Sequence, residues 1–366
     1  DSIWRSSGQK SAIIGSNGLL AGDELRRFDL TTPQSLDLQE SLALLLKKNI
    51  RNVAMEVSSH ALVQGRVAHC SFQAAVFTNL TREHLDYHRS MSEYLQAKTF
   101  LLTLLKSSAA RAIFNADDRW FHQIRTLARQ PVITYGIRDH SATIRASRLK
   151  SSPTGRYSFY LSGWEEPLKV KLALPGMFNV YNALAAAAVA WKECLPATAV
   201  VKGLSLLRGV PGRMEEISTE EGYSVIIDFA HTPDSLEKVL KLLKQRLPQR
   251  LITVFGCPGE RDRGKRPLMG RIAEQYSQLV ILTTDNPARE DPEEIIKEIK
   301  SNMSSQPVVI LDRQQAVGYA LSQARSGDIV LLAGKGAEEY QLVGDQQIPY
   351  NERQVVKAYL RRRSSK

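Results

Sequence analysis

Cysteine, long apolar runs and clustered charge are the features that this sequence has little of. Its 366 residues include three cysteines, Cys70, Cys194 and Cys257, which lie far apart and form no CxxC pair. Such sparse cysteines argue against a disulfide scaffold and a structural zinc site, and they fit a reducing compartment. No apolar run reaches the roughly 18 residues that a membrane-spanning helix needs. With no signal peptide visible, we expect a cytoplasmic protein without membrane insertion.

The excess of positive charge is not gathered into a binding surface. The formal net charge is +11, but the basic residues are dispersed apart from the C-terminal Arg361, Arg362, Arg363 and Lys366. No stripe of arginine or lysine alternates with aromatic residues, as a nucleic-acid surface would require. A solvated tail, or attraction to a phosphate-rich small substrate, explains the charge at least as well. We therefore predict no nucleic-acid partner.

A phosphate-binding loop of the form GxxGK[ST] is also missing. The nearest string, Ser7-Gly-Gln-Lys-Ser11, has the lysine and the serine but lacks the upstream glycine and the spacing. Any nucleotide site must therefore be recognised from other motifs.

Short apolar runs alternate with amphipathic helical stretches along the whole chain. The expected strands are Val53–Val57, Ala74–Phe77, Val225–Phe229, Leu251–Phe255, Leu279–Thr283, Val308–Leu311 and Ile329–Ala333. The expected helices include Ala183–Ala190, which is small and apolar enough to be buried, and Asp234–Gln245, Gly270–Tyr276 and Pro292–Lys300. This alternation predicts an α/β protein with mostly parallel sheets. Residues 141–168 look more irregular, and Gly209-Val-Pro-Gly-Arg213 marks a domain boundary.

Two clusters of polar residues directly follow expected strands. They are Met55-Glu-Val-Ser-Ser-His-Ala-Leu62 and Thr78-Asn-Leu-Thr-Arg-Glu-His-Leu-Asp-Tyr-His88. Parallel α/β sheets place ligands at the carboxyl ends of their strands, and carboxylates there suit a hard cation such as Mg²⁺ bound with phosphate. Capping of the strand end explains any one of these residues alone. The spacing does not match a zinc protease, and no GxSxG elbow supports a serine hydrolase.

Taken in order, these motifs resemble the Mur ligase family. The shared strings are Glu56-Val-Ser-Ser-His60, Thr78-Asn-Leu-Thr-Arg-Glu-His84, Asn115-Ala-Asp-Asp118, Gly176-Met-Phe-Asn-Val-Tyr-Asn182, Gly212-Arg-Met214 and Asp228-Phe-Ala-His-Thr-Pro-Asp234. The branch that adds a diamino acid is indicated by Thr31-Thr-Pro33, Arg261-Asp262, Lys265-Arg-Pro-Leu-Met269, Asp285-Asn-Pro287 and Gly334-Lys-Gly336. The resemblance extends from about Gly8 to the last helix.

The resemblance implies an ATP-dependent amide ligase of peptidoglycan synthesis. In this family ATP phosphorylates the glutamate carboxylate of UDP-MurNAc-L-Ala-D-Glu, and the amine of the incoming amino acid attacks the acyl phosphate. ATP and Mg²⁺ are therefore the implied cofactors, because phosphoryl transfer between anions needs metal ions and fixed cations. Glu56 and His84 match Mg²⁺ ligands, and Lys98 matches the carbamylated lysine that helps hold a second Mg²⁺. Without the resemblance, Lys98 would be interpreted as a surface lysine on a helix.

Further site residues follow from the same resemblance. The positions that match contacts to the UDP-muramyl dipeptide are Thr31, Thr32, Ser58, Gln64 and Arg66. Those that match ATP contacts are Asn179, Asn182, Arg213, Asp228 and His231, although Asp228 alone could simply cap the helix that starts near Pro233. Those expected around the incoming amino acid are Arg261, Asp285, Asn286, Gly334 and Glu338.

The amino-acid pocket departs from the family pattern. Diaminopimelate-adding enzymes have Asp-Asn-Pro-Arg, whereas this chain has Asp285-Asn286-Pro287-Ala288, with Arg289 one place later. Loss of that arginine removes a partner for the second carboxylate of diaminopimelate. Glu338 and Gly264-Lys-Arg-Pro-Leu-Met269 nevertheless resemble the diaminopimelate branch. We predict meso-diaminopimelate as the substrate, with L-lysine or ornithine as the alternative.

The predicted architecture is an α/β protein of two domains. Residues 1–210 form a P-loop-type Mur central domain that is incomplete because its P-loop is missing, and residues 211–366 form a Rossmann-like, doubly wound domain. We expect an N-terminally truncated chain that does not turn over by itself and is a monomer acting on small molecules. The alternatives are a degenerate ligase that serves as a binding module, and a folylpolyglutamate or cyanophycin synthetase.

Overall fold

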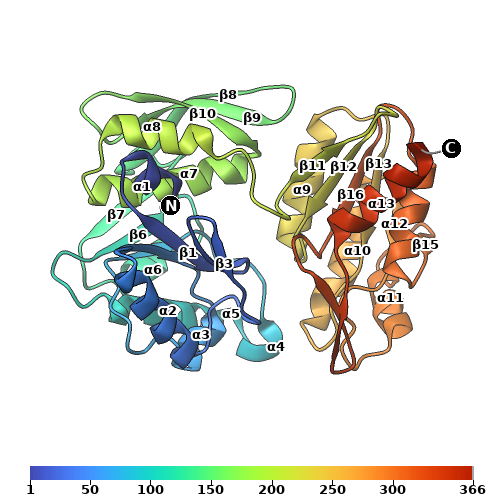
Figure 1. Cartoon of the computed structure of the whole chain (residues 1–366), viewed down its shortest axis with the longest axis horizontal. Helices are drawn as coiled ribbons and strands as arrows, with labels where there is room; N and C mark the ends of the chain where they lie inside the picture. The colour runs from blue at the N-terminus through green and yellow to red at the C-terminus, as the bar shows by residue number, and fades with distance from the viewer. Residues whose placement is uncertain (365–366) are drawn as a thin grey trace. The chain divides into compact units, whose positions relative to one another are not determined.

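The computed structural model describes residues 1–364, which fall into two compact units (Figure 1). The first comprises Asp1–Thr81 and His88–Arg208, and the second comprises Arg82–Tyr87 and the residues from Gly209 onward. Among residues 1–364, no helix is both long and apolar enough to cross a membrane.

The first unit begins with a four-stranded sheet in the order β3-β2-β1-β4. Its strands are β1 (Ser11–Gly15), β2 (Gly18–Ala21), β3 (Glu24–Arg26) and β4 (Asn52–Met55). The helix α2 (Ser35–Lys47) separates β3 from β4, and β4 pairs parallel to β1. The buried Ala12, Ile14, Leu38 and Leu45 form part of its core. This pairing brings the carboxyl ends of β1 and β4 to the same edge.

A second sheet of the same unit has the order β10-β9-β8-β7-β6-β5. Its strands are β5 (Ala74–Phe77), β6 (Arg111–Asn115), β7 (Val132–Gly136), β8 (Ile144–Ser151), β9 (Arg156–Ser162) and β10 (Leu168–Pro175). From β5 to β8 the pairs are parallel, and β8, β9 and β10 form an antiparallel meander. The expectation of an irregular segment at residues 141–168 is therefore wrong. Buried residues alternate with more exposed ones at the start of β8, as in a half-buried strand, but a register shift between Ser147 and Lys150 breaks the period.

Helices pack on these sheets. They are α1 (Ser2–Ser6), α3 (Ser59–Val63), α5 (Met91–Thr99), α6 (Phe121–Arg125), α7 (Met177–Lys192) and α8 (Ala197–Leu206), with a 3₁₀ turn η1 (Phe100–Leu104). The alanine-rich α7 is buried along most of its length, as predicted. Its small side chains allow close approach to β6, β7 and β8, around Ile113, Tyr135 and Ile144.

The second unit is a six-stranded sheet in the order β11-β12-β16-β13-β14-β15. The strands are β11 (Glu215–Ser218), β12 (Ser224–Asp228), β13 (Leu251–Phe255), β14 (Leu279–Leu282), β15 (Val308–Val309) and β16 (Ile329–Ala333). All pairs are parallel except that of β11 with β12. The helices are α9 (Pro233–Gln245), α10 (Arg266–Tyr276), α11 (Pro292–Lys300), α12 (Arg313–Gln323) and α13 (Glu352–Ser364), with the turn η2 (Arg263–Lys265). Residues 85–87 of the short α4 (Leu85–His88) also belong to this unit. A hairpin of β17 (Tyr340–Val343) and β18 (Gln346–Pro349) follows β16.

The predicted α/β class with mostly parallel sheets is confirmed, and β5, β13 and β16 have the predicted bounds. Other elements differ from their predicted bounds, two of them more clearly. The strand expected at Val308–Leu311 is only two residues long, and α10 begins at Arg266 rather than at Gly270. The start of α10 is hidden in the sequence because its first residue is an arginine that is fully buried.

Candidate functional site

The carboxyl ends of β1 and β4 bring together oxygen-bearing side chains. The Glu56 carboxylate accepts a hydrogen bond from Ser16 Oγ at 2.9 Å, and Ser16 Oγ lies 3.2 Å from Thr31 Oγ1. A Cβ atom on Gly15 would lie 2.8 Å from the Glu56 carboxyl carbon, so a larger residue at this position would displace the carboxylate. Hard oxygen donors of this kind suit Mg²⁺. Ser16 was not among the predicted site residues.

The predicted substrate residues beside this corner are held largely by the backbone. Thr32 is fully buried, and its hydroxyl donates to the Glu56 carbonyl at 2.9 Å and accepts from the Ser58 N–H at 3.0 Å. Ser58 caps α3 by accepting from Ala61 N–H. Arg66 is buried and donates from Nε to Gln64 Oε1 at 2.9 Å. These contacts fix the loop after β4, in which the Ser58 side chain caps the following helix.

Lys98 lies near the end of α5. Its ammonium is 4.9 Å from the centre of the Tyr94 ring, a cation–π distance. Lys98 also lines a cavity of about 10 Å³ together with Thr78, Asn115 and Asp118, residues of two other family motifs. The lysine is half-buried beside these motifs.

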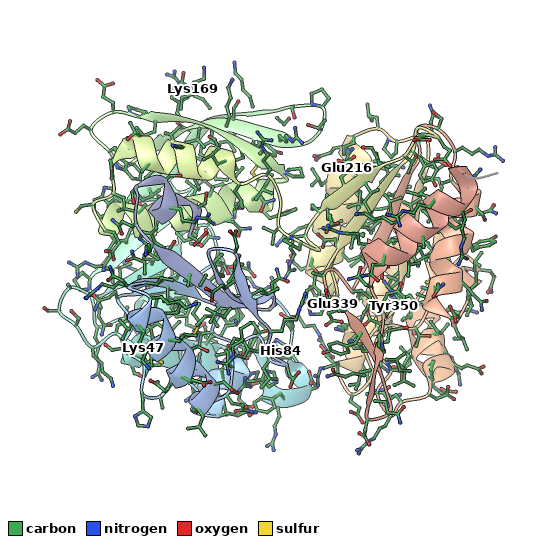
Figure 2. The ribbon with its side chains drawn as sticks, viewed as in Figure 1. Lys47, His84, Lys169, Glu216, Glu339 and Tyr350 are labelled. Atoms are coloured by element: carbon green, nitrogen blue, oxygen red, sulfur yellow. The ribbon has the colours of Figure 1, made fainter. Side chains whose placement is uncertain are left out.

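His84, labelled in Figure 2, belongs to the segment Arg82–Tyr87 that clusters with the second unit. Its backbone is left-handed, with φ +57°. The neighbouring Glu83 accepts a hydrogen bond from His231 Nε2 at 2.9 Å, and Arg82 pairs with Asp262. Within residues 1–364, no three His, Cys, Asp or Glu side chains gather as a metal cluster. The metal roles of Glu56, His84 and Lys98 therefore stay predictions.

The two asparagines predicted to contact ATP line one cavity. This cavity has a volume of about 240 Å³ and is bordered mainly by apolar residues of α1, α7, α8 and β10. Asn179 Nδ2 donates to the Pro175 carbonyl at 2.7 Å, and Asn182 Nδ2 donates to Asn179 Oδ1 at 3.1 Å. An apolar cavity with a few fixed polar groups is typical of a small-molecule binding site.

Asp228, at the end of β12, fixes the turn that carries Arg213. Its carboxylate oxygens accept hydrogen bonds from Met214 N–H at 2.7 Å and from Ala230 N–H at 2.8 Å. Burial raises the pKa of Asp228, and these two bonds and the charge of Arg213 oppose that rise. The alternative that Asp228 caps α9 is wrong, because Thr232 is the cap. Arg213 itself is exposed and lies 4.6 Å from the centre of the Phe229 ring.

The predicted amino-acid residues converge on a lysine that the sequence analysis missed. Lys335 is fully buried, and its Nζ donates to Asn286 Oδ1 at 2.8 Å and to Glu338 Oε2 at 2.5 Å. Asp285 Oδ1 lies 4.0 Å from the same ammonium. A Cβ atom on Gly334 would lie 2.5 Å from Asp285 Oδ2, which explains the glycine. The structure thus brings together four of the five predicted residues.

Arg261, the fifth, lies on the loop that follows β13. This loop contacts the same pocket, because Gly259 N–H donates to the Asn286 carbonyl at 2.9 Å. Behind the pocket, the buried Arg313 pairs with Glu352 at 3.0 Å and donates to the Ala333 carbonyl at 3.0 Å. A buried arginine and a buried lysine are hard to recognise in a sequence, because charged residues are rarely buried.

The two residues that depart from the family pattern, Ala288 and Arg289, both contact the β17–β18 hairpin. Ala288 donates its N–H to the Leu342 carbonyl at 3.0 Å and so pairs by its backbone with the β17–β18 hairpin. Its backbone is left-handed, with φ +50°. Arg289 instead pairs with the exposed Asp345 at the hairpin turn, at 2.7 Å. The Arg289 guanidinium is therefore engaged at the hairpin turn in this structure.

Comparison with known proteins agrees with these features. The model of the Mur ligase middle domain matches residues 1–190, and that of the Mur ligase, glutamate ligase domain matches residues 212–336. The chain therefore belongs to the Mur ligase family. Its similarity to curated relatives makes it a MurE-type ligase within that family.

The relatives are UDP-N-acetylmuramoyl-L-alanyl-D-glutamate–2,6-diaminopimelate ligases. That of Syntrophomonas wolfei is 42% identical over 98% of this chain and 74% of its own length. That of Caldanaerobacter subterraneus is 41% identical over 98% and 74%. A solved structure of such a ligase matches with a TM-score of 0.64 and 34% identity over 99% of this chain and 75% of its own. MurF from Acinetobacter baumannii, at 16% identity, a TM-score of 0.72 and coverage of 98% and 72%, shares the fold.

Proposed function

We propose that this protein joins meso-diaminopimelate to the D-glutamyl carboxylate of UDP-MurNAc-L-Ala-D-Glu, with ATP and Mg²⁺ as cofactors. The observation that carries this proposal is the pocket around Lys335. Two carboxylates, Asp285 and Glu338, face one buried ammonium, so these three side chains have a formal net charge of −1. A diamino acid brings a second ammonium group that this charge attracts. The names of the relatives support the same substrates.

The reaction needs an activated carboxylate, because a free carboxylate has no leaving group that an amine can displace at neutral pH. Transfer of the ATP γ-phosphoryl group forms an acyl phosphate, and attack by the amine then releases phosphate. Asn179 and Asn182 are proposed to contact the adenine, and Arg213 and His231 to contact the phosphate and ribose side. Asp228 contributes by holding the turn of Arg213. Fixed cations lower the barrier by neutralising charge in the transition state.

The oxygen donors at the carboxyl ends of β1 and β4 fit Mg²⁺. Glu56 and His84 are proposed as Mg²⁺ ligands, and a carbamylated Lys98 would help hold a second ion. Mg²⁺, when bound, neutralises phosphate charge. Thr31, Thr32, Ser58, Gln64 and Arg66 are proposed to form the muramyl dipeptide side of the site, with Thr32 and Ser58 acting through the backbone they hold. A monomeric, cytoplasmic enzyme remains part of the proposal.

One observation favours L-lysine or ornithine as the second candidate. Ala288 offers no partner to the second carboxylate of diaminopimelate, and Arg289 is paired with Asp345. Equilibrium dialysis of radiolabelled meso-diaminopimelate, L-lysine and L-ornithine against the full chain decides between them. The chain is kept with UDP-MurNAc-L-Ala-D-Glu, Mg²⁺ and a non-hydrolysable ATP analogue. Tighter binding of diaminopimelate is expected, and tighter binding of lysine or ornithine contradicts this substrate.

Turnover is tested by phosphate release and by the mass of the muramyl tripeptide. The sequence-based expectation is that residues 1–366 alone give no product, because they contain no GxxGK[ST] loop. A fusion that adds the N-terminal portion of the Syntrophomonas wolfei relative should form the tripeptide. A fusion that is folded but forms none of the three possible tripeptides contradicts the proposed function and favours a degenerate binding module.

A further inference from the structure

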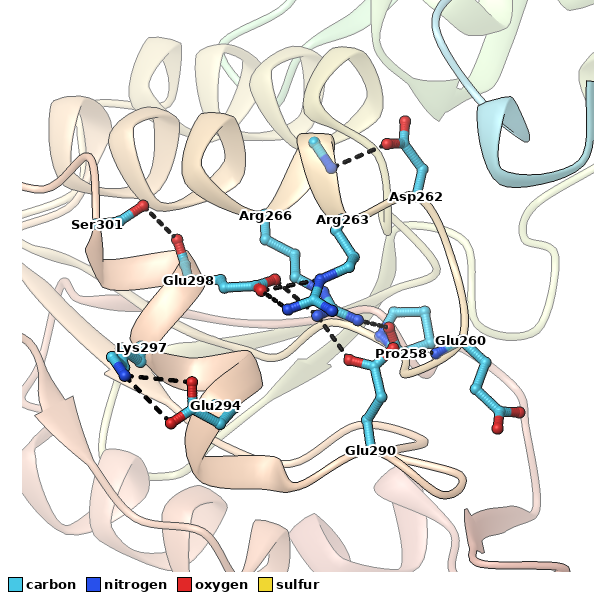
Figure 3. Close-up of polar contacts among 11 residues, drawn as sticks. Pro258, Glu260, Asp262, Arg263, Arg266, Glu290, Glu294, Lys297, Glu298 and Ser301 are labelled. Atoms are coloured by element: carbon cyan, nitrogen blue, oxygen red, sulfur yellow. Dashed lines mark hydrogen bonds and ion pairs between the residues drawn. The ribbon is translucent and has the colours of Figure 1, made fainter. Parts of the chain in front are cut away.

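A buried arginine, for which the proposed mechanism has no role, lies beside the loop that carries Arg261. Arg266 is the first residue of α10, and its side chain is fully buried, with an exposed fraction of 0%. Its Nη1 donates to Glu290 Oε2 at 2.8 Å and to Glu298 Oε2 at 2.7 Å, and its Nη2 donates to the Pro258 carbonyl at 3.1 Å (Figure 3). One guanidinium thus joins the loop after β13 to the segment after β14 and to α11.

Glu290 extends this connection to the backbone next to Arg261. Its second oxygen, Oε1, accepts a hydrogen bond from the Glu260 N–H at 2.6 Å. Glu260 has φ +54°, a left-handed conformation that a residue with a Cβ atom adopts at a cost. The hydrogen bond to Glu290 offsets that cost, because it is made only when Glu260 lies in this place. The carboxylate of Glu290 therefore fixes the backbone immediately before Arg261.

The loop that carries Arg261 is also held by close contacts of Gly259 with residues 286 and 287. Gly259 N–H donates to the Asn286 carbonyl at 2.9 Å, and a Cβ atom on Gly259 would lie 1.9 Å from the Pro287 carbonyl oxygen. The loop therefore packs backbone against backbone on the segment that carries Asp285 and Asn286.

We infer that Arg266 and Glu290 are positioning residues for Arg261, which place its side chain for the carboxylate of the incoming amino acid. The inference rests on the proposed function, in which Arg261 binds that carboxylate. Arg266 holds the Pro258 carbonyl and Glu290 holds the Glu260 N–H, so two backbone groups within three residues of Arg261 are fixed. The Arg261 side chain itself is exposed and can meet a ligand.

Charge supports this arrangement. Hydrogen bonding to Arg266 lowers the pKa of Glu290, and burial opposes the shift. Burial lowers the pKa of Arg266, but Glu290 and Glu298 raise it further than burial lowers it. Both partners of the pair are therefore charged at neutral pH, and the bonds between them are the stronger, charge-assisted kind.

The experiment is a double-mutant cycle on meso-diaminopimelate binding. The full chain is dialysed with Mg²⁺, UDP-MurNAc-L-Ala-D-Glu and a non-hydrolysable ATP analogue. The variants are Arg261→Met, Glu290→Ala and their combination, with Glu290→Gln as a milder change. Glu294→Ala is the matched control, because Glu294 lies on the neighbouring α11 and pairs there with the exposed Lys297. Circular dichroism and nucleotide affinity establish that each variant is folded.

Arg261→Met and Glu290→Ala should each weaken diaminopimelate binding about tenfold or more, at unchanged nucleotide affinity. In the Arg261→Met background, Glu290→Ala should weaken diaminopimelate binding by less than about a further twofold, because the Arg261 side chain that it positions is already absent. Glu290→Gln should lie between wild type and Glu290→Ala, and it decides the matter if Glu290→Ala does not fold.

Different results would overturn the proposed role of Arg261 and the positioning role of Glu290. If Arg261→Met binds diaminopimelate like the wild type, the proposed role of Arg261 is wrong. If Arg261→Met loses binding while Glu290→Ala and Glu290→Gln keep it, the positioning role is overturned. The same holds if Glu290→Ala weakens binding equally in both backgrounds, since its effect would then be independent of Arg261.

Discussion

The buried ammonium of Lys335 lies 2.8 Å from the amide oxygen of Asn286. The same amide donates from Nδ2 to Glu338 Oε2 at 3.1 Å, so the three side chains form a closed triangle. Asn286 Oδ1 also accepts from Leu342 N–H at 3.0 Å, which ties the triangle to β17. Both polar atoms of the Asn286 amide are engaged within the protein. Asn286 therefore shapes the amino-acid pocket, and Glu338 Oε1 is the atom better placed to meet a substrate ammonium.

Removal of the Lys335 ammonium should destabilise the protein and weaken amino-acid binding, because Asn286 and Glu338 lose the group that holds them. Lys335→Met leaves Asp285 and Glu338 without their counter-charge, and breaking a buried ion pair costs about 3 kcal/mol or more. Urea unfolding and diaminopimelate dialysis measure the two effects. The control is Lys297→Met, because Lys297 is 74% exposed in its pair with Glu294 and should matter by less than about 1 kcal/mol. Equal losses in the two variants would contradict a special role for Lys335.

Sequence patterns predicted the parts of this structure that depend on local hydrophobicity. The buried strands β13 and β16 are continuous apolar runs, and such runs show their bounds directly. The order of the motifs also placed Asp285, Asn286 and Glu338 in one pocket. Lys335, Arg266 and Arg313 were missed as buried charges. Their partners include Glu298, Glu352 and Asn286, which lie 32, 39 and 49 residues away in the chain, and no local pattern reveals such distant partners.

The pair of Arg313 with Glu352 should behave as a structural unit behind the pocket. Both side chains are 0% exposed, and Arg313 also donates to the Ala333 carbonyl, next to Gly334. Arg313→Met alone leaves a buried carboxylate without a partner, at a cost of about 3–5 kcal/mol in unfolding free energy. The double variant Arg313→Met with Glu352→Leu should recover a large part of that loss. Urea unfolding checks both values, and additive losses would refute the coupling.

Introduction of the family arginine at position 288 should increase the preference for diaminopimelate over lysine. Ala288→Arg supplies a planar fork for the second carboxylate of diaminopimelate, which lysine lacks. The ratio of diaminopimelate to lysine affinity should rise about tenfold or more. Arg289→Ala should leave this ratio unchanged, because Arg289 pairs with Asp345 and both side chains are exposed. Dialysis with both amino acids tests the pair of variants, and a fall of the ratio in Arg289→Ala would show that Arg289 reaches the substrate.

The contact of Glu83 with His231 should make stability depend on acid pH. Burial raises the pKa of Glu83, but the hydrogen bond from His231 and the charges of His231, His84 and Lys265 lower it to about 2 from its usual 4.5. Because the folded-state pKa is lowered, the stabilisation is complete above pH 4.5 and is lost as the pH falls toward 2. Glu83→Gln should therefore lower the unfolding free energy at pH 6 by on the order of 3 kcal/mol and have little effect near pH 2. Urea unfolding across this range measures the difference, with the exposed Glu93→Gln as control. A difference between wild type and Glu83→Gln that does not change with pH would refute the ionic contact.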